Sequence, residues 1–383
     1  MNSHPGWSSS SGLQSSKDTP RARQNATTPV RLLIGSYTET SVRYSPESGI
    51  QTSCFDLPDG SLEPAATLAA ARNPSFLALA DQLGCVYSVN ETTTFEGGAG
   101  GGITAYRLEA GAEGLTVLNS RPSHGELPCH LAVSPSERHL VATNYQDGVV
   151  SVYPIRPDGS LGESSSVVRH AGTGSDPDRQ ASPHPHMALF DPKTGDLLVP
   201  DLGADAVFVY SLGHDGILRE RADRIIQLPA GSGPRHAVFS PDEDILFINN
   251  ELTSTVAVAE RSSTGFRIIG RCSTLPEGFD KSNYTAAIKV AASGKFVLVT
   301  NRGMDSIAVL KFDRQSKSLT LLGTEPTGGR EPRDLAVSPD GRHVVVANQD
   351  DDELASFAFD TLSGRLTQIS RCSAETPTCV AFV

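Results

Sequence analysis

One spacing recurs along this chain: an Asn or Asp stands sixteen residues after a Pro, with two aliphatic positions, a turn and a second apolar run in between. Five copies begin with Pro, and Thr285 takes the place of the Pro before Asn301. The Pro-led pairs are Pro74 with Asn90, Pro128 with Asn144, Pro185 with Asp201, Pro234 with Asn250, and Pro332 with Asn348. Self-similarity at a period of roughly 50 residues is typical of solenoids and propellers. The repeat therefore predicts one body built from like units.

Within each unit the apolar side chains alternate with period two, which indicates strands. In the last full copy, Leu335 and Val337 stand three and five residues after the leading Pro. A turn such as Ser338-Pro339-Asp340-Gly341 then leads into a second apolar run, which completes a hairpin. Two further strands follow the Asn, as in residues 149–153 and the segment after the Asp158-Gly159 turn. Each unit is thus expected to hold four antiparallel strands.

Four strands per unit without helical periodicity predict an all-β fold, a seven-bladed β-propeller. Six units are complete, residues 377–383 begin a seventh, and residues 31–37 resemble the half that it lacks. A last blade shared by the N- and C-terminal segments would close the ring and cover its edges. We predict a single propeller over residues 29–383, preceded by a disordered Ser-rich tail over residues 1–28.

The charge balance limits the partners. A formal net charge of −12 disfavours nucleic acid and anionic lipid, because non-specific binding to either needs a basic face. No apolar run approaches the roughly 18 residues that span a bilayer. The tail lacks the apolar core of a secretory signal, and the six cysteines form no CxxC pair. We expect reduced thiols, a cytoplasmic location, and neither a nucleic-acid nor a membrane partner, and the oligomeric state stays open.

Equivalent positions in successive blades lie at the same height around the central channel of a propeller. Two such positions carry chemistry here: the residue after the leading Pro and the residue seventeen after it. Both are expected at one rim, because the first strand of a hairpin begins where the second ends. In three neighbouring units, the residues at these two positions include His186, Arg235, Glu251 and Arg302. Two guanidiniums can bind an anion, and a carboxylate or imidazole can move a proton. They predict a catalytic site.

Weaker candidates for substrate binding are Arg333, Glu91, Tyr145 and Asp201. The alternative for all of these side chains is an ion-pair network without catalytic use. The repeated Asn is expected to be structural, because an Asn at a strand end readily bonds nearby backbone. His184 lies out of step with the repeat and is expected to bond locally. His130 and His236 follow their prolines by two residues, which predicts that they point away from the rim side chains.

No motif for a cofactor or a metal is present. HExxH, the dinucleotide fingerprint and the Gx-Ser-xG elbow are all missing. The run at residues 97–102 is rich in Gly, yet no Lys-Ser/Thr follows it and a strand rather than a helix comes next. A phosphate loop is therefore not predicted. We expect no cofactor and no metal.

Taken together, several short stretches resemble the seven-bladed lactonase family, which contains propeller-type 6-phosphogluconolactonases and fungal carboxy-cis,cis-muconate cyclases. The matches include Gly35-Ser36-Tyr37-Thr38, Ser182-Pro183-His184-Pro185-His186, Gly233-Pro234-Arg235-His236, Asn250-Glu251-Leu252 and Asn301-Arg302-Gly303. The resemblance implies an active site at the His of PHxH, the Arg of GPRH, the Glu of NEL and the Arg of NRG. These are His186, Arg235, Glu251 and Arg302. In one departure, Ala287 stands where the family motif AAEI has Glu.

The favoured interpretation is a cofactor-independent sugar-lactone hydrolase resembling 6-phosphogluconolactonase, acting on a small anionic substrate in carbohydrate metabolism. Arg235 and Arg302 would hold anionic groups and polarise the lactone carbonyl. Glu251 would activate water as general base, with His186 as its proton partner. An isomerase resembling the muconate cyclases would use the same groups on carboxymuconate. A non-catalytic propeller scaffold predicts an aromatic-rich rim, whereas the chain is 6% aromatic.

Overall fold

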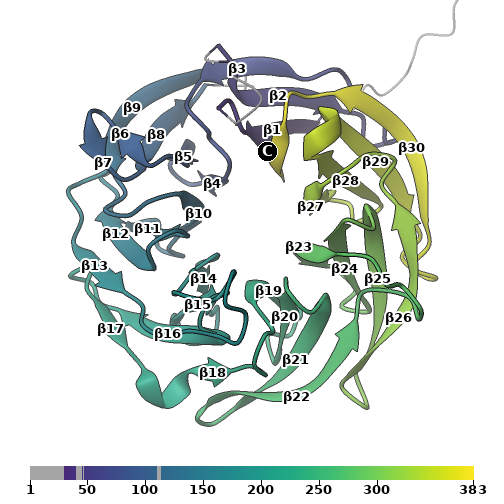
Figure 1. The fold of residues 1–383 in the computed structure, drawn as a ribbon. Coiled ribbons are helices and arrows are strands. Elements are labelled where there is room, and N and C mark those ends of the chain that lie inside the picture. The colour runs from purple at the N-terminus through teal and green to yellow at the C-terminus, as the bar shows by residue number, and fades with distance from the viewer. Residues whose placement is uncertain (1–29, 40–44, 46, 110–113) are drawn as a thin grey trace, which may run out of the picture.

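Seven antiparallel sheets stand radially around a central channel in the computed structural model (Figure 1). The structure describes residues 30–39, 45, 47–109 and 114–383, so the predicted tail at residues 1–28 lies outside the described residues. Each sheet contains a set of four strands in meander order, and the two short helices within the described residues are single 3-10 turns. The prediction of an all-β seven-bladed propeller with four antiparallel strands per blade is confirmed.

In six blades the strands follow chain order from the channel outward. The first three of these contain β4 (Leu77–Ala80), β5 (Cys85–Asn90), β8 (Gly102–Leu108) and β9 (Leu115–Pro122); β10 (Pro128–Val133), β11 (His139–Asn144), β12 (Val149–Pro154) and β13 (Ser166–Arg169); and β14 (Leu189–Phe190), β15 (Leu197–Asp201), β16 (Ala206–Leu212) and β17 (Leu218–Glu220), with β18 (Ile226–Gln227) beside β16. Between β5 and β8 lies a small hairpin, β6 (Thr94–Phe95) and β7 (Gly98–Ala99).

The next three blades have the same order. They contain β19 (Pro234–Phe239), β20 (Ile245–Asn250), β21 (Thr255–Ser262) and β22 (Gly265–Ser273); β23 (Tyr284–Val290), β24 (Phe296–Arg302), β25 (Ser306–Asp313) and β26 (Ser318–Pro326); and β27 (Pro332–Val337), β28 (His343–Asn348), β29 (Glu353–Phe359) and β30 (Leu366–Ser373). The 3-10 turns are η2 (Ala222–Arg224) and η3 (Gln349–Asp351).

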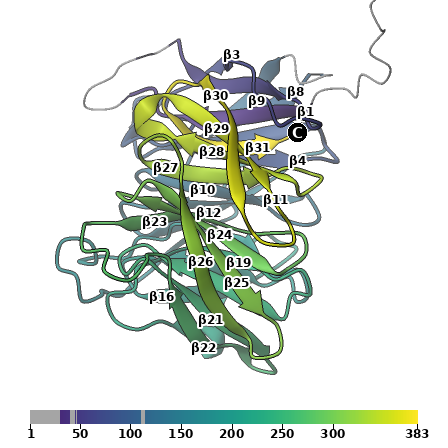
Figure 2. The ribbon, with the colours of Figure 1, turned by 90° about the vertical axis from the view of Figure 1, so that its right-hand side faces the viewer.

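The two ends of the chain build the closing blade together. Its strands are β1 (Val30–Ser36), β2 (Gly49–Phe55), β3 (Ala66–Ala70) and β31 (Pro377–Phe382), in the order β3-β2-β1-β31. β31 pairs antiparallel with β1, with Leu33 opposite Ala381 and Ile34 opposite Val380. This pairing brings the yellow and purple ends of the chain together in Figures 1 and 2. The predicted closure of the ring by shared terminal segments is confirmed, and it pairs β1 on both sides, with β2 and with β31.

The apolar core lies between neighbouring blades. Leu298 and Val309 of one blade pack in one buried cluster with Val346 and Phe357 of the next. Both faces of each inner sheet region are therefore covered, and β5 and β28 are buried along their whole length. Period-two alternation supplies apolar side chains to both faces, so each blade needs its neighbours to bury them.

The sixteen-residue offset measures one hairpin. Pro128 pairs with Asn144 and Pro332 with Asn348, each at the open end of the two inner strands. The Asn144 amide donates to the carbonyls of Ser123 and Val149, at 3.3 and 3.1 Å. Ser123 follows the outer strand of the preceding blade, so the repeated Asn links two blades. Its role is structural, as expected, although its bonds reach neighbouring segments rather than its own backbone.

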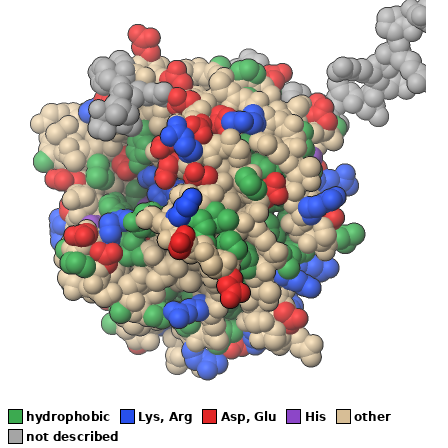
Figure 3. Space-filling model, turned by 45° about the vertical axis from the view of Figure 1, so that its right-hand side comes forward, with side chains coloured by type: hydrophobic (Ala, Val, Ile, Leu, Met, Phe, Trp, Pro, Cys, Tyr) green, Lys and Arg blue, Asp and Glu red, His purple; other side chains and the backbone are tan. Residues whose placement is uncertain are grey.

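The surface side chains and the cysteines give little further information about the fold. On the face shown in Figure 3, acidic and basic side chains are interspersed. The six cysteines are free thiols. Among the described residues, no helix has the length and hydropathy to cross a membrane.

Candidate active site

A β-bulge follows the leading proline in the innermost strand of several blades. In β19 the pairing shifts between Pro234 and His236, which makes Arg235 the extra residue. Cys129 in β10 and Arg333 in β27 occupy the same place. A bulge bends the strand and re-aims the side chains beside it. The residue after the proline is thus set apart from the ordinary alternation of the strand, at the channel.

The expectation that His130 and His236 point away from the rim side chains is wrong. The His236 ring lies 5.4 Å from the His186 ring and 5.5 Å from the His130 ring. The Arg235 Nη1 is 3.4 Å from His236 Nε2, although the two residues are adjacent in the strand. Strict alternation fails because the bulge inserts one residue, so neighbouring side chains can lie on the same side. Three imidazoles are thereby gathered at the channel.

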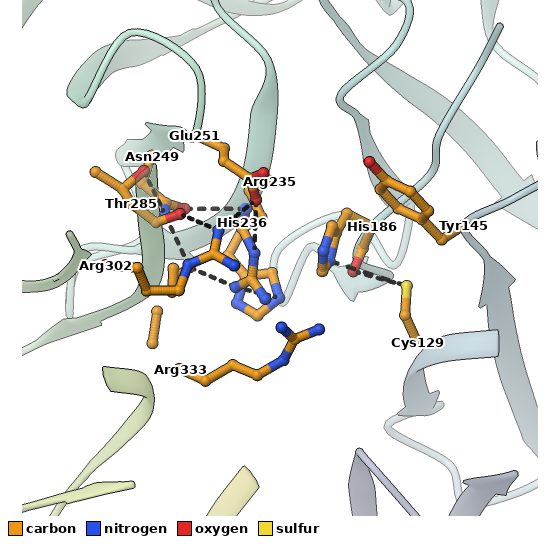
Figure 4. Close-up of polar contacts among 12 residues, drawn as sticks. Cys129, Tyr145, His186, Arg235, His236, Asn249, Glu251, Thr285, Arg302 and Arg333 are labelled. Atoms are coloured by element: carbon orange, nitrogen blue, oxygen red, sulfur yellow. Dashed lines mark hydrogen bonds and ion pairs between the residues drawn. The ribbon is translucent and has the colours of Figure 1, made fainter. Parts of the chain in front are cut away.

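The carboxylate of Glu251 is the centre of a charge cluster (Figure 4). Its Oε2 lies 2.9 Å from Arg302 Nη2 and 3.2 Å from Arg235 Nε. Its Oε1 lies 2.6 Å from Nη2 of Arg179. Burial raises the pKa of Glu251, but the guanidiniums of Arg302, Arg235 and Arg179 outweigh it and lower that pKa to about 2. Glu251 is therefore an anion at any physiological pH.

Two of these arginines are also fixed by backbone carbonyls of β23. Arg235 Nη1 donates to the Ala286 carbonyl at 2.5 Å, and Arg302 Nη2 donates to the Thr285 carbonyl at 3.3 Å. The departure from the family motif lies in the same segment. The side chain of Ala287 is 1% exposed and belongs to the apolar core between two blades, outside the charge cluster. The segment therefore serves this site through its backbone.

His186 stands beside this cluster as an uncharged imidazole. Burial, together with the positive charges of Arg235, Arg333 and Arg302, lowers the pKa of His186 well below 6.5. Its Nδ1 is 3.9 Å from Cys129 Sγ, and the Tyr145 ring packs edge-on at 5.5 Å. For Nε2, no hydrogen-bond partner exists among the described residues. His186 can therefore accept a proton at neutral pH.

A narrow pocket in the channel joins these side chains to the closing blade. It is lined by Ser75, Phe76, Glu91, Cys129, His186, Arg235, His236, Arg333, Asp334 and Thr378. The guanidinium of Arg333 extends toward the space between His186 and Arg235 (Figure 4). Its Nη2 donates to the Tyr37 hydroxyl at 2.8 Å, and no carboxylate of the described residues lies within 4.0 Å of it. Arg333 thus brings to the pocket a guanidinium without a direct carboxylate partner.

Glu91 and Tyr145 follow the second strands, β5 and β11, of two neighbouring blades. Glu91 Oε1 accepts a hydrogen bond of 2.8 Å from the Tyr37 hydroxyl, and its other oxygen accepts one from Ser75. The Tyr145 hydroxyl lies 3.3 Å from Arg179 Nη2. His184 stacks on Tyr145 and bonds its backbone carbonyl at 2.6 Å, which agrees with the expectation of local bonding. Both weaker candidates therefore lie near the arginines.

Asp201 is the one sequence candidate that the structure does not bring to the cluster. Its fully buried side chain holds His170 Nδ1 at 2.7 Å and accepts the backbone N–H groups of His184 and Ala204 at 2.7 and 3.0 Å. Asp201 occupies the position of the repeated Asn, but it accepts backbone N–H groups where the Asn144 amide donates to backbone carbonyls. Asp201 therefore acts on the geometry of the segment that carries His186.

We expect Asp201→Asn to lower the free energy of unfolding by about 1.5–3 kcal/mol, because a buried hydrogen bond to a charged group is lost while Oδ1 is kept. Urea denaturation of the two proteins measures the difference. Asn is the residue that five other copies of the repeat carry here, so the backbone tolerates it. Equal stability of the variant and the wild type would contradict this account of Asp201.

Comparison with known proteins identifies the family of this propeller. The family model described as "Lactonase, 7-bladed beta-propeller" matches residues 31–382. The chain belongs to this lactonase family. Among relatives of this lactonase is the 6-phosphogluconolactonase of Bacillus subtilis, 33% identical over 353 residues, which are 91% of this chain and 97% of that protein.

Solved structures agree over nearly the whole lactonase. The periplasmic gluconolactonase PpgL of Pseudomonas aeruginosa superposes with a TM-score of 0.84 at 33% identity, over 92% of this chain and 99% of that one. A protein of Lactobacillus plantarum has the same TM-score at 32% identity, over 93% and 99% of the two chains. The propeller, its closing blade and the channel are thus shared along their full length.

Arg179 is the part of this site that the repeat does not reveal. It lies in the loop between β13 and β14, outside both repeated rim positions, yet it contacts Glu251 and Tyr145 from two other blades. No spacing in the sequence marks it.

As for metals, no cluster of His, Cys, Asp and Glu within the described part of the lactonase is arranged to hold an ion.

Proposed function

We propose that this lactonase hydrolyses an anionic sugar lactone of the 6-phosphogluconolactone type in carbohydrate metabolism, without a cofactor. The observation that carries the proposal is the pairing of uncharged His186 with Arg333 in one channel pocket. A proton acceptor and a guanidinium free of a direct carboxylate partner suit water attack on a carbonyl. The names of the relatives support the same reaction, since they include a 6-phosphogluconolactonase and a gluconolactonase.

In the proposed step, a water oxygen bonds to the lactone carbonyl carbon while its proton passes to His186 Nε2. Arg333 stabilises the negative charge that develops on the carbonyl oxygen. The bond from the carbonyl carbon to the ring oxygen then breaks, and the ring oxygen takes the proton back from His186. The product is the open hydroxy acid, and His186 is neutral again.

Glu251 takes a different role in this proposal from the general base suggested by the sequence. A carboxylate with a pKa of about 2 is a weak base, because three guanidiniums stabilise its charge. The same contacts make it an effective anchor: it orients Arg235 and Arg302 through Oε2 and Arg179 through Oε1. We therefore assign proton transfer to His186 and positioning of the arginines to Glu251.

The competing muconate cyclase reaction requires a substrate with several carboxylates. Glu91 faces the pocket with both oxygens already bonded to Tyr37 and Ser75, and its charge repels a further carboxylate at that end. Sugar hydroxyls, in contrast, can donate to the remaining lone pairs of Glu91. This difference favours a hydroxylated lactone over carboxymuconate.

The purified protein is expected to hydrolyse 6-phosphoglucono-δ-lactone far faster than its spontaneous rate, and to leave the absorbance of carboxy-cis,cis-muconate unchanged. Acid release at constant pH measures the first reaction, and loss of muconate absorbance measures the second. Muconate turnover without lactone hydrolysis would instead establish the cyclase. Activity on neither substrate would support a binding scaffold.

As for the compartment, the free cysteines fit a reducing environment, and we propose the cytoplasm.

A further inference from the structure

The three guanidiniums around Glu251 carry more positive charge than that carboxylate can neutralise. Arg179, Arg235 and Arg302 all have Glu251 as their carboxylate partner, and no other carboxylate among the described residues lies within 4.0 Å of them. Burying such an excess is unfavourable unless another anion arrives. A phosphate monoester carries about −1.5 to −2 charges near pH 7, which matches the excess.

Arg179 is the member of this trio that a ligand can reach. Its side chain is 33% exposed, whereas those of Arg302 and Arg235 are 12% and 3% exposed. Its contacts with Glu251 and Tyr145 both use Nη2. An arginine has five N–H donors, so Nε and Nη1 remain for a ligand. Each of these donors can make a charge-assisted hydrogen bond to a phosphate oxygen.

The backbone around Arg179 is fixed. Asp176 Oδ1 accepts the N–H of Arg179 at 3.1 Å, and the next residue, Gln180, is fully buried. The Gln180 amide donates to the Leu202 carbonyl and to Asp205, at 2.7 Å each. The loop therefore holds Arg179 at a set place, and its orientation is a built feature of the site.

An aromatic side chain completes this end of the site. The Arg179 guanidinium lies over the Tyr284 ring, 5.4 Å from its centroid, and Tyr284 is 39% exposed. Tyr284 is also the strand partner of Arg302. The ring limits hydration of the Arg179 guanidinium on one side and leaves the other side to an anion.

We infer that Arg179, with Arg302 beside it, binds the phosphate of a phosphorylated sugar lactone and sets the preference for it over the neutral lactone. This inference rests on the proposed hydrolysis, because it names the substrate class of the same site. The reacting carbonyl lies at His186 and Arg333, and the phosphate binds at Arg179, whose side chain is the most exposed of the three arginines.

The test compares kcat/KM for 6-phosphoglucono-δ-lactone with kcat/KM for glucono-δ-lactone. Arg179→Gln is expected to lower the ratio of the two about 10- to 100-fold, the effect of losing charge-assisted hydrogen bonds. Arg179→Lys keeps the positive charge but replaces the planar set of guanidinium donors with an ammonium group. It should therefore lower the ratio less. Arg169→Gln is the matched control, since it removes a 60% exposed surface arginine of the preceding strand, and it should leave the ratio unchanged.

An unchanged ratio in Arg179→Gln would overturn the inference. The inference also fails if kcat/KM falls equally for the two lactones, because Arg179 then serves only to position Glu251. If Arg179→Gln does not fold, the ratio in Arg179→Lys decides in the same way. If the wild type hydrolyses neither lactone, the proposed function fails by itself. Calorimetric titration with 6-phosphogluconate and gluconate then tests the phosphate site directly, and equal affinity for the two would overturn it.

Discussion

Glu251→Gln is expected to lower the free energy of unfolding by about 3–5 kcal/mol and to remove most of the lactone hydrolysis. The amide has the size of the carboxylate but no charge. Arg235, whose side chain is 3% exposed, is then left buried without its counter-ion, and Arg302 and Arg179 lose theirs as well. Because mutually repelling guanidiniums no longer converge on one anion, the pocket beside them also loses its geometry.

Urea denaturation followed by circular dichroism measures the stability of this variant. Glu260→Gln is the matched control, because Glu260 also contacts two cations, Lys317 and Arg267, but does so at the surface. Surface ion pairs of this kind contribute little, so the control is expected to behave as the wild type. A Glu251→Gln protein as stable as the control would show that the cluster does not depend on the carboxylate.

The pH dependence of stability gives the same contact a second readout. The folded-state pKa of Glu251 is lowered from 4.5 to about 2, so the contribution of the carboxylate is present above pH 4.5 and is lost as the pH falls toward 2. The stability difference between the wild type and Glu251→Gln should therefore shrink across that window. A difference that stays constant from pH 6 to about pH 2 would contradict the ionised pair.

The fold could be predicted because its determinants are local or repeated. A sixteen-residue hairpin such as the one from Pro128 to Asn144 contains its own turn and its own pairing, and period-two alternation is visible in a single sequence. The closing blade was predictable from incompleteness, since residues 377–383 lack partners that residues 31–37 can supply. Neither inference needed a side-chain position.

The site was predictable where it follows the repeat and not elsewhere. Arg235, Glu251 and Arg302 occupy repeated positions, and the geometry brings them within ion-pair distance. The directions of His130 and His236 depend on bulges, which leave no mark in the apolar pattern. Arg179 reaches the site from a loop outside the repeat.

The role of Glu251 illustrates a further limit of sequence reasoning. A carboxylate near two arginines can act as a general base or can hold the arginines in position. The number of its cationic partners decides between these two roles. The third partner, Arg179, is 72 residues away in sequence and comes from a loop with no fixed spacing. Its contact lowers the pKa of Glu251 further and occupies the second carboxylate oxygen, and for this reason we propose a neighbouring group for proton transfer.

His186→Asn is expected to lower kcat for lactone hydrolysis about 10²- to 10⁴-fold, the usual contribution of general acid–base catalysis, while the fold is retained. Asn preserves a polar side chain beside Cys129 and Tyr145 but cannot take up the proton of the attacking water. The backbone hydrogen bond from His186 N to the Pro200 carbonyl is unaffected by the change. Stopped-flow acid release with the phosphorylated lactone measures the rate.

The pH profile of kcat/KM separates His186 from Glu251 as the base. Burial and nearby arginines hold the pKa of His186 well below 6.5, and the pKa of Glu251 is about 2. If His186 accepts the proton, wild-type activity falls on the acidic side of pH 6.5 as the imidazole becomes protonated, and the residual activity of His186→Asn lacks that acidic limb. An acidic limb near pH 2 in the wild type, kept in His186→Asn, would return the role of base to Glu251. His214→Asn, at an exposed hairpin turn, is the control and should keep the wild-type profile.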